Sequence, residues 1–281
     1  MSFIQMLLIA LVQGVTEFLP ISSSGHLIIL PYLTGFEDQG PMIDIAVHVG
    51  SLLAIVTYFF RDVAGLARGG FASIGIGKAP QEKRLFWWII IGTIPAVVVG
   101  LAIKTGMLNG VFQTMFNLQI KNDDLLESLR LTHLIAVNLI VYGILLGVAD
   151  KFGRTNRSFE NVRFLDGLLV GLAQSLALIP GTSRSGVTMT MARMLGFARV
   201  EAARFSFLLS IPAIAGAGVL IVPDLLKADS ALLVEALITG GLTFLAALAT
   251  MVFLMRFLKN ASMMVFVVYR VLMGVALLYF F

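Results

Sequence analysis

Apolar runs long enough to cross a lipid bilayer dominate this sequence. A membrane-spanning helix needs about 20 consecutive apolar residues. Hydrophobic residues make up 58% of the 281 residues and charged residues 13%, whereas soluble domains average roughly 45–50% and about 25%. The sequence therefore predicts an all-α polytopic membrane protein with a single integral membrane domain over residues 1–281. The six predicted spans are Ile43–Phe60, Leu85–Ile103, Leu131–Ala149, Phe205–Val222, Leu232–Met255 and Met263–Phe281.

Two further apolar segments, Phe3–Pro31 and Phe164–Met194, are each broken near the centre by Pro, Ser and Gly. These residues remove a helical hydrogen bond or favour turns. At bilayer depth, such non-helical backbone is tolerated only where it is buried in protein or lines a wet cavity. We therefore predict two re-entrant helix-turn-helix hairpins. A single kinked span is the alternative for either segment.

Lysine and arginine gather in two of the short loops, Arg61–Arg84 and Lys151–Arg163. Short loops rich in these residues stay in the cytoplasm, so we expect both loops there. The segments Lys104–Arg130 and Pro223–Ser230 should then lie outside. With this orientation, the first hairpin enters from the outer face and the second from the inner face.

The chain is accordingly predicted to contain two inverted-topology repeats, each a hairpin followed by three transmembrane helices. Repeat 1 covers about 1–153 and repeat 2 about 154–281. In such repeats the broken helices meet near the bilayer midplane and build the binding site there.

The two hairpins carry related polar motifs. The first runs from Gln13 to His26 and the second from Gln174 to Gly186, and in both the glutamine lies twelve residues before the glycine that closes the Ser-rich turn. The first copy contains Glu17, and the second contains an arginine instead. Ionisable residues inside a membrane are costly and usually functional, so the motifs predict a site shared between the hairpins.

The second motif has the composition of an anion-binding site. Arg184 offers a planar fork of donors suited to phosphate or carboxylate oxygens. Small residues beside it let backbone amides approach an anion, and a helix that begins near Ser185 would direct its positive end there. The candidate substrate-binding residues in this motif are Gly181, Thr182, Ser183, Ser185 and Gly186.

The first motif supplies the complementary groups. Ser22, Ser23 and Ser24 carry hydroxyls that could donate to an anion, and one of them could act as a nucleophile beside a base. The available acids or bases are Glu17 and His26. Carboxylate, hydroxyl, imidazole and guanidinium together suit phosphoryl transfer, in which positioning and charge neutralisation do most of the work.

A divalent cation is a further expectation for the first motif. Gln13 and Glu17 are four residues apart and share one face of a helix. They are the candidate metal ligands, together with substrate oxygens. Because the chain has no cysteine, thiolate ligation is excluded.

Structural roles compete with each of these interpretations. A serine in a membrane turn can simply satisfy backbone groups freed by a proline, which applies to Ser22 and Ser24 more than to Ser23. Glu17 and Arg184 could form a structural salt bridge, since buried charges are usually paired. His48 lies in an apolar span without a motif, so we expect packing or a hydrogen bond to a neighbouring helix in preference to a catalytic role.

At these motifs the sequence resembles the undecaprenyl-diphosphate phosphatase family, also known as bacitracin-resistance proteins. The family's Glu-rich element and Pro-x-Ser-Ser-x-Gly-His turn match Gln13, Glu17 and Pro20 to His26. Its Pro-Gly-x-Ser-Arg-Ser-Gly element matches Pro180 to Gly186, and the likeness covers essentially the full length. This chain has Gln13 where many members have glutamate, which weakens any mechanism that needs two carboxylates.

The resemblance implies a bacterial inner-membrane enzyme whose pocket opens towards the periplasm. Its reaction would be hydrolysis of polyprenyl diphosphate to the monophosphate with a divalent cation, Mg²⁺ or Ca²⁺, which recycles the carrier for peptidoglycan synthesis. Carried over by position, Glu17 and His26 would be catalytic, Ser23 the nucleophile or a phosphate ligand, and Arg184 the diphosphate clamp.

A transporter or flippase of an anionic lipid or small anion is the rival function, because broken helices in inverted repeats are typical of secondary transporters. The lipid bilayer is the expected environment in both cases. The formal charge of +4 lies mainly in short loops, which argues against nucleic-acid binding. Whether copies of the chain form a homo-oligomer is left open by the sequence.

Overall fold

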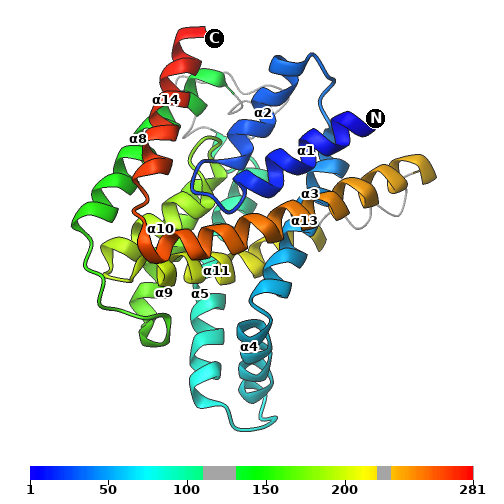
Figure 1. Cartoon of the computed structure of the whole chain (residues 1–281). Coiled ribbons are helices and arrows are strands. Elements are labelled where there is room, and N and C mark those ends of the chain that lie inside the picture. Colours follow the sequence, from blue (N-terminus) through cyan, green and yellow to red (C-terminus); the bar gives the residue numbers. More distant parts are fainter. Residues whose placement is uncertain (110–130, 220–228, 281) are drawn as a thin grey trace.

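The computed structural model describes residues 1–109, 131–219 and 229–280, and within them the chain is built from helices (Figure 1). This confirms the predicted all-α class. In chain order the helices are α1 Phe3–Thr16, α2 Ser23–Thr34, α3 Gly40–Tyr58, α4 Phe60–Ser73, α5 Pro80–Lys104, α8 Thr132–Phe152, η1 Phe159–Asn161, α9 Phe164–Ser175, η2 Leu176–Leu178, α10 Arg184–Met194, α11 Arg199–Val219, α13 Ser230–Asn260 and α14 Met264–Phe280.

Four helices in the described part, α3, α5, α8 and α13, are long and apolar enough to cross a bilayer. They correspond to four of the six predicted spans. The fifth, α14, is a shorter apolar helix, and the sixth, α11, starts six residues before the predicted Phe205. The predicted outer segments Lys104–Arg130 and Pro223–Ser230 fall largely outside the described residues.

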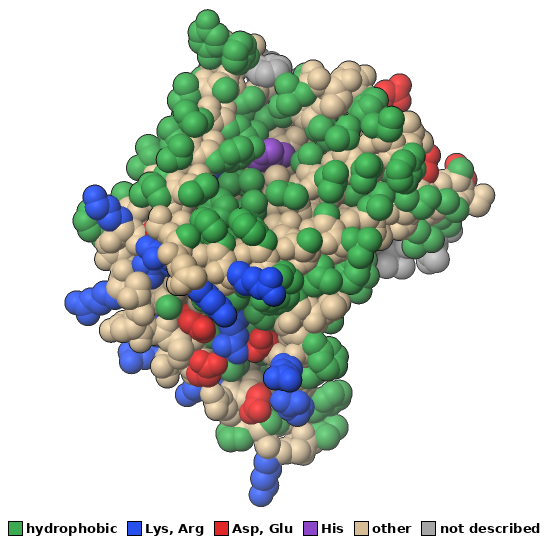
Figure 2. Space-filling view, in the orientation of Figure 1, with side chains coloured by type: hydrophobic (Ala, Val, Ile, Leu, Met, Phe, Trp, Pro, Cys, Tyr) green, Lys and Arg blue, Asp and Glu red, His purple; other side chains and the backbone are tan. Residues whose placement is uncertain are grey.

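The segment Arg61–Arg84, expected to be a loop, contains most of the fourteen-residue helix α4. This helix packs against α5, and the two project from the helical body (Figure 1). Arg204 of α11 ties the region down through Asp62, at 2.5 Å, and Glu160, at 2.9 Å. Lysine and arginine side chains gather at this end of the molecule in Figure 2, whereas hydrophobic side chains cover much of the remaining face. The loop was predicted from its lysine and arginine residues alone, and these charges are equally compatible with an amphipathic helix.

Both interrupted apolar segments form two helices joined by a turn, α1 to α2 and α9 to α10. α1 packs against α13, whereas α9 packs against α5, which is the exchange of partners expected from two copies of one unit. Small residues allow the close approach, as is common in membranes. A Cβ on Gly14 of α1 would lie 2.6 Å from the Cβ of Ala246 on α13. The inverted topology of the repeats stays a prediction.

A buried arginine fixes the far end of the second hairpin. Arg193 of α10 is fully buried, and it donates hydrogen bonds to the backbone carbonyls of Asp150, Gly153, Arg154 and Phe197. The carboxylate of Asp150, 3.4 Å from Arg193 Nε, balances its charge. These contacts hold the end of α10 against the end of α8.

Replacing Asp150 with asparagine should destabilise the protein strongly, because it leaves a buried guanidinium without a counter-charge. The expected loss is about 3–5 kcal/mol, measured as a lower thermal unfolding temperature in detergent. Glu37→Gln, which changes an exposed carboxylate, should stay within about 0.5 kcal/mol of wild type. Equal unfolding temperatures for the two variants would contradict this role of Asp150.

Candidate active site

The turns that break the two hairpins share one local geometry. Ser22 and Ser183 have positive φ values of 77° and 71°, which non-glycine residues rarely adopt. Each caps the helix that follows, with its Oγ accepting a hydrogen bond from the amide of Gly25 or Gly186. Consequently the next residue of each turn becomes the first residue of α2 or α10. These two first residues are Ser23 and Arg184.

The Glu17 carboxylate joins the two turns. Its Oε1 accepts a hydrogen bond from Arg184 Nη2 at 2.5 Å, and its Oε2 accepts one from Ser23 Oγ at 2.6 Å. Gln13 Nε2 donates to the same Oε2 at 3.0 Å. A second tie between the turns is the hydrogen bond from Ser185 Oγ to the carbonyl of Leu19, at 3.1 Å. The salt bridge between Glu17 and Arg184, which the sequence raised as a structural alternative, is therefore present, and the serine most favoured as nucleophile shares that carboxylate.

A cavity of about 420 Å³ opens beside this carboxylate. An ion pair with a purely structural role needs no such space, and Arg184 keeps 19% of its side chain accessible against 5% for Glu17. The predicted site residues that line the cavity are Glu17, Ser23, Ser24, Ser183 and Arg184.

Arg270 of α14 holds the two turns together from behind. Its guanidinium donates to the carbonyl of Pro20 in the first turn, at 3.1 Å, and to those of Gly181 and Thr182 in the second, at 3.0 and 2.9 Å. It also donates to the carbonyls of Asn138 and Leu139 in α8. One fully buried side chain thus satisfies backbone groups that the broken helices leave open.

Several predicted substrate-binding residues lie behind the cavity. A Cβ on Gly186 would meet Arg270 Nη1 at 2.7 Å, and one on Gly181, whose φ is +85°, would meet the carbonyl of Ile135 at 2.6 Å. These packing contacts account for both glycines without a ligand. Ser22 and Ser185 act in the cap and the tie described above. Thr182 is fully buried, and its Oγ1 has no hydrogen-bond partner among the residues that the structure describes. Their contact with substrate stays a prediction.

The two histidines are placed differently from expectation. His26 bonds the carbonyl of Ser22 through Nδ1 at 2.7 Å and the hydroxyl of Tyr269 through Nε2 at 2.6 Å, and it does not line the cavity. His48, expected to pack, does line the cavity. Its Nδ1 lies 2.6 Å from the carbonyl of Asp44, to which it donates, and its Nε2 lies 3.9 Å from Glu17 Oε2.

Gln174 is a further cavity residue that the site prediction left out. It is 2% exposed, and neither atom of its amide has a hydrogen-bond partner within the described structure. Buried polar atoms are normally bonded, so this amide is available to a ligand. Its place opposite Gln13 in the repeated motif was visible in the sequence. No comparable motif in the sequence indicated His48.

The predicted divalent cation requires free oxygen ligands near Glu17 and Gln13. Gln13 is fully buried and its Oε1 has no partner among the described residues, close to the Glu17 carboxylate that its Nε2 contacts. No group of three or more His, Asp or Glu side chains forms a metal cage in that part of the chain. One carboxylate and one amide oxygen fit a hard cation that takes its other ligands from phosphate and water, as Mg²⁺ commonly does.

Comparison with known proteins assigns the chain to a family. The family model described as bacitracin resistance protein BacA matches residues 6–276. The chain belongs to the BacA family. Relatives named undecaprenyl-diphosphatase occur in Erythrobacter litoralis, with 66% identity over 100% of both chains, and in Nitrosococcus oceani, with 44% identity over 100% of both chains. Undecaprenyl-diphosphatase 1 of Pseudoalteromonas translucida is 41% identical over 100% of this chain and 99% of the relative.

In this BacA-family protein, replacing Arg270 with lysine should destabilise the junction of the turns. Because a lysine ammonium cannot reach carbonyls on both turns and on α8, some lose their donor, at about 1–3 kcal/mol for each buried carbonyl. Thermal unfolding in detergent measures the loss. Arg256→Lys, at an exposed position of α13, is the matched control and should unfold like wild type. An Arg270→Lys variant as stable as that control would show that the guanidinium fork is dispensable.

Proposed function

We propose that this protein hydrolyses undecaprenyl diphosphate to undecaprenyl phosphate and inorganic phosphate. Such hydrolysis recycles the lipid carrier for peptidoglycan synthesis and gives resistance to bacitracin. Full-length relatives at 41–66% identity carry the name of this activity. The observation that carries the proposal is the Glu17 carboxylate, which contacts a serine hydroxyl from one turn and an arginine from the other at the wall of a cavity.

Arg184 binds the diphosphate in this proposal. Its guanidinium rests on Glu17 and, at 3.4 Å, on the carbonyl of Ser210. Phosphate oxygens can replace the carboxylate as bidentate acceptors, which releases Glu17 to act as a base. The N-terminus of α10, where Arg184 begins the helix, adds amides without intrahelical acceptors and a positive dipole end.

Ser23 is the nucleophile. Its Oγ attacks the terminal phosphorus while its proton passes to Glu17 Oε2, to which it already donates at 2.6 Å. The bond from phosphorus to the bridging oxygen breaks, and polyprenyl phosphate leaves. Water then hydrolyses the phosphoserine, which frees inorganic phosphate and restores the hydroxyl. His48 lines the cavity and, through Nε2, accepts the proton of this water.

His26 acts as a positioning residue in this arrangement. Both ring nitrogens are engaged, with Ser22 behind Ser23 and with Tyr269 next to Arg270. Its ring therefore holds the start of α2, and with it the nucleophile, against α14. The role predicted from the motif is kept in part, because the residue acts on the nucleophile's placement.

A divalent cation, Mg²⁺ or Ca²⁺, would be held by Glu17 and Gln13 Oε1 together with substrate phosphate. When bound, such an ion neutralises charge that develops on the phosphate oxygens. The chain's own residues keep the roles given above.

The bacterial inner membrane is the proposed location, with the cavity opening towards the periplasm. The cavity is lined by the first half of α3, between Pro41 and Val49. The cationic segment with Arg61 and Arg68 follows the opposite end of that helix. By the positive-inside rule that end faces the cytoplasm. A homo-oligomer is compatible with this arrangement and is not required by it, because every proposed site residue comes from one chain.

The transporter alternative is disfavoured by the names of the relatives and by the equipment of the site. An anion carrier needs a cation and donors, whereas a serine that donates to a buried carboxylate belongs to nucleophilic chemistry. Inorganic phosphate released by detergent-solubilised protein supports hydrolysis. Movement of the lipid across proteoliposomes without phosphate release would support transport.

Arg184→Ala should lower phosphate release from undecaprenyl diphosphate by about 100- to 1000-fold, the effect of losing one donor that stabilises transition-state charge. The assay follows inorganic phosphate from purified protein in detergent. Arg256→Ala, at an exposed position, should keep the wild-type rate. Wild-type release by a correctly inserted Arg184→Ala variant would refute the proposed clamp.

Chelation should abolish phosphate release, and added Mg²⁺ or Ca²⁺ should restore it. The reason is that Arg184 alone does not neutralise a diphosphate that lies beside the Glu17 carboxylate in a poorly solvated site. Phosphate release is measured after exhaustive treatment with a chelator and again after adding back each cation. An undiminished rate in the chelated protein would remove the metal from the account.

A further inference from the structure

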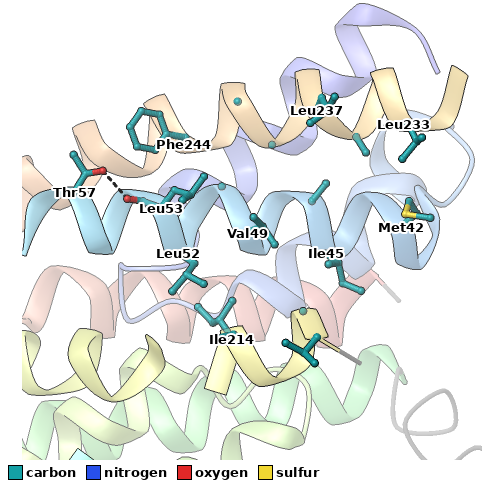
Figure 3. Close-up of a pocket in the computed structure, with 18 residues that line it drawn as sticks. Met42, Ile45, Val49, Leu52, Leu53, Thr57, Ile214, Leu233, Leu237 and Phe244 are labelled. Atoms are coloured by element: carbon teal, nitrogen blue, oxygen red, sulfur yellow. Dashed lines mark hydrogen bonds between the residues drawn. The ribbon is translucent and has the colours of Figure 1, made fainter. Parts of the chain in front are cut away.

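The two cavities of the membrane part differ in the polar groups that they offer a ligand. The larger one, of about 900 Å³, lies between α3, α11 and α13, and Figure 3 shows the apolar side chains along it. The part of its lining that the structure describes has one hydroxyl, that of Thr57, which donates to the carbonyl of Leu53. This apolar groove therefore offers no free side-chain donor to an anion. The cavity beside Glu17 offers one, on Gln174.

Gln174 corresponds to Gln13 in the repeated motif. Each glutamine precedes the capping serine of its turn by nine residues, Ser22 in the first hairpin and Ser183 in the second. The two serines have similar positive φ values and cap the following helix in the same way. The two glutamines are therefore at equivalent positions of two turns that share one geometry.

The turns differ in the residue four positions after each glutamine. In the first hairpin this residue is Glu17, and Gln13 Nε2 donates to its carboxylate at 3.0 Å. In the second hairpin it is Leu178, which packs in an apolar cluster with Ile103 and has no acceptor in its side chain. Gln174 thus lacks the anionic partner that its counterpart has. Both polar atoms of its amide are buried and unpartnered within the described structure.

We infer that Gln174 is a substrate-binding residue whose amide donates a hydrogen bond to a phosphate oxygen of the diphosphate. This inference rests on the proposed function. The substrate supplies to Gln174 the anion that Glu17 supplies to Gln13. Gln174, Leu178 and Arg184 line the same cavity, so a diphosphate held by the guanidinium brings its oxygens to that wall. A hydrogen bond to a charged oxygen is stronger than one between neutral groups.

An unpartnered amide in the protein interior has an energetic cost that substrate binding removes. A buried polar group without a hydrogen bond destabilises the folded state relative to an apolar side chain of similar shape. The ligand-free protein should therefore become more stable when Gln174 is replaced by methionine, which has a similar length and no donor. A glutamine that served the fold would behave in the opposite way, because its loss would break a contact. The sign of the change in stability separates the two roles.

The first measurement is thermal unfolding in detergent without ligand. Gln174→Met should unfold about 2–4 °C above wild type, the shift expected when one buried unsatisfied group is removed from a chain of this size. Gln39→Met is the control of opposite sign, because Gln39 is buried and donates to Asp44 at 2.7 Å. It should unfold below wild type. Gln81→Met, at an exposed position, should match wild type.

The second measurement is the binding of methylenediphosphonate, a diphosphate analogue whose bridging carbon resists hydrolysis, in the presence of Mg²⁺. Gln174→Met should bind it about 10- to 100-fold more weakly than wild type, the effect of losing one hydrogen bond to a charged group. Its kcat/KM for undecaprenyl diphosphate should fall by a similar factor. Gln81→Met should keep the wild-type values in both assays.

The outcomes separate this inference from the proposed function. A Gln174→Met variant that does not unfold above wild type, fails to fold, or binds the diphosphonate as tightly as wild type would overturn the inference. Wild-type protein that does not bind the diphosphonate would overturn it as well. If wild type binds the diphosphonate and Gln174→Met shows the expected loss, but wild type releases no phosphate from undecaprenyl diphosphate, the proposed function fails and the contact of Gln174 with phosphate oxygens stands.

Discussion

Backbone groups that leave a helix at bilayer depth must find partners within the protein, because hydrocarbon supplies none. Two apolar segments of this chain break into separate helices, and Arg270 bonds carbonyls from both breaks and from α8. At each turn a serine, Ser22 or Ser183, adopts the same unusual positive-φ conformation and caps the helix that follows. Because these backbone groups have hydrogen-bond partners, an irregular, polar centre can exist inside an apolar protein. The candidate site is built on the two turns.

Because the two turns share one geometry, they bring equivalent positions together, and these positions carry different side chains. Ser23 and Arg184 each begin a helix directly after a capping serine, and each touches one oxygen of Glu17. One turn thus presents a hydroxyl and the other a guanidinium to the same carboxylate. The polar cavity lies at this meeting point, and the apolar groove between α3 and α13 continues from it.

Much of this was predictable because the information is local in the sequence. Apolar run length predicted the class and four spanning helices, and Pro, Ser and Gly within apolar segments predicted both breaks. The opposite charges in the two motifs predicted a site shared between the hairpins, and they raised the Glu17–Arg184 salt bridge as a structural alternative that the structure contains. The features that the sequence did not predict depend on contacts between segments far apart in the chain. Nothing near His48 in the sequence indicates that α3 carries its ring to the cavity, and the His26 motif does not show that Tyr269, 243 residues away, occupies its Nε2. Likewise, Gly186 resembles an anion-loop glycine, yet it makes room for Arg270.

The central claim is that Ser23, activated by Glu17 and facing Arg184, takes the phosphate from the substrate. The most direct measurement supplies undecaprenyl diphosphate labelled on its terminal phosphate, stops the reaction with acid within one turnover, and locates label on the protein. Labelled Ser23 is expected in wild type and in Ser24→Ala, a variant that lacks the hydroxyl of the neighbouring cavity residue. Neither label nor phosphate release is expected with Ser23→Ala. Release of phosphate at the wild-type rate by Ser23→Ala would contradict the central claim.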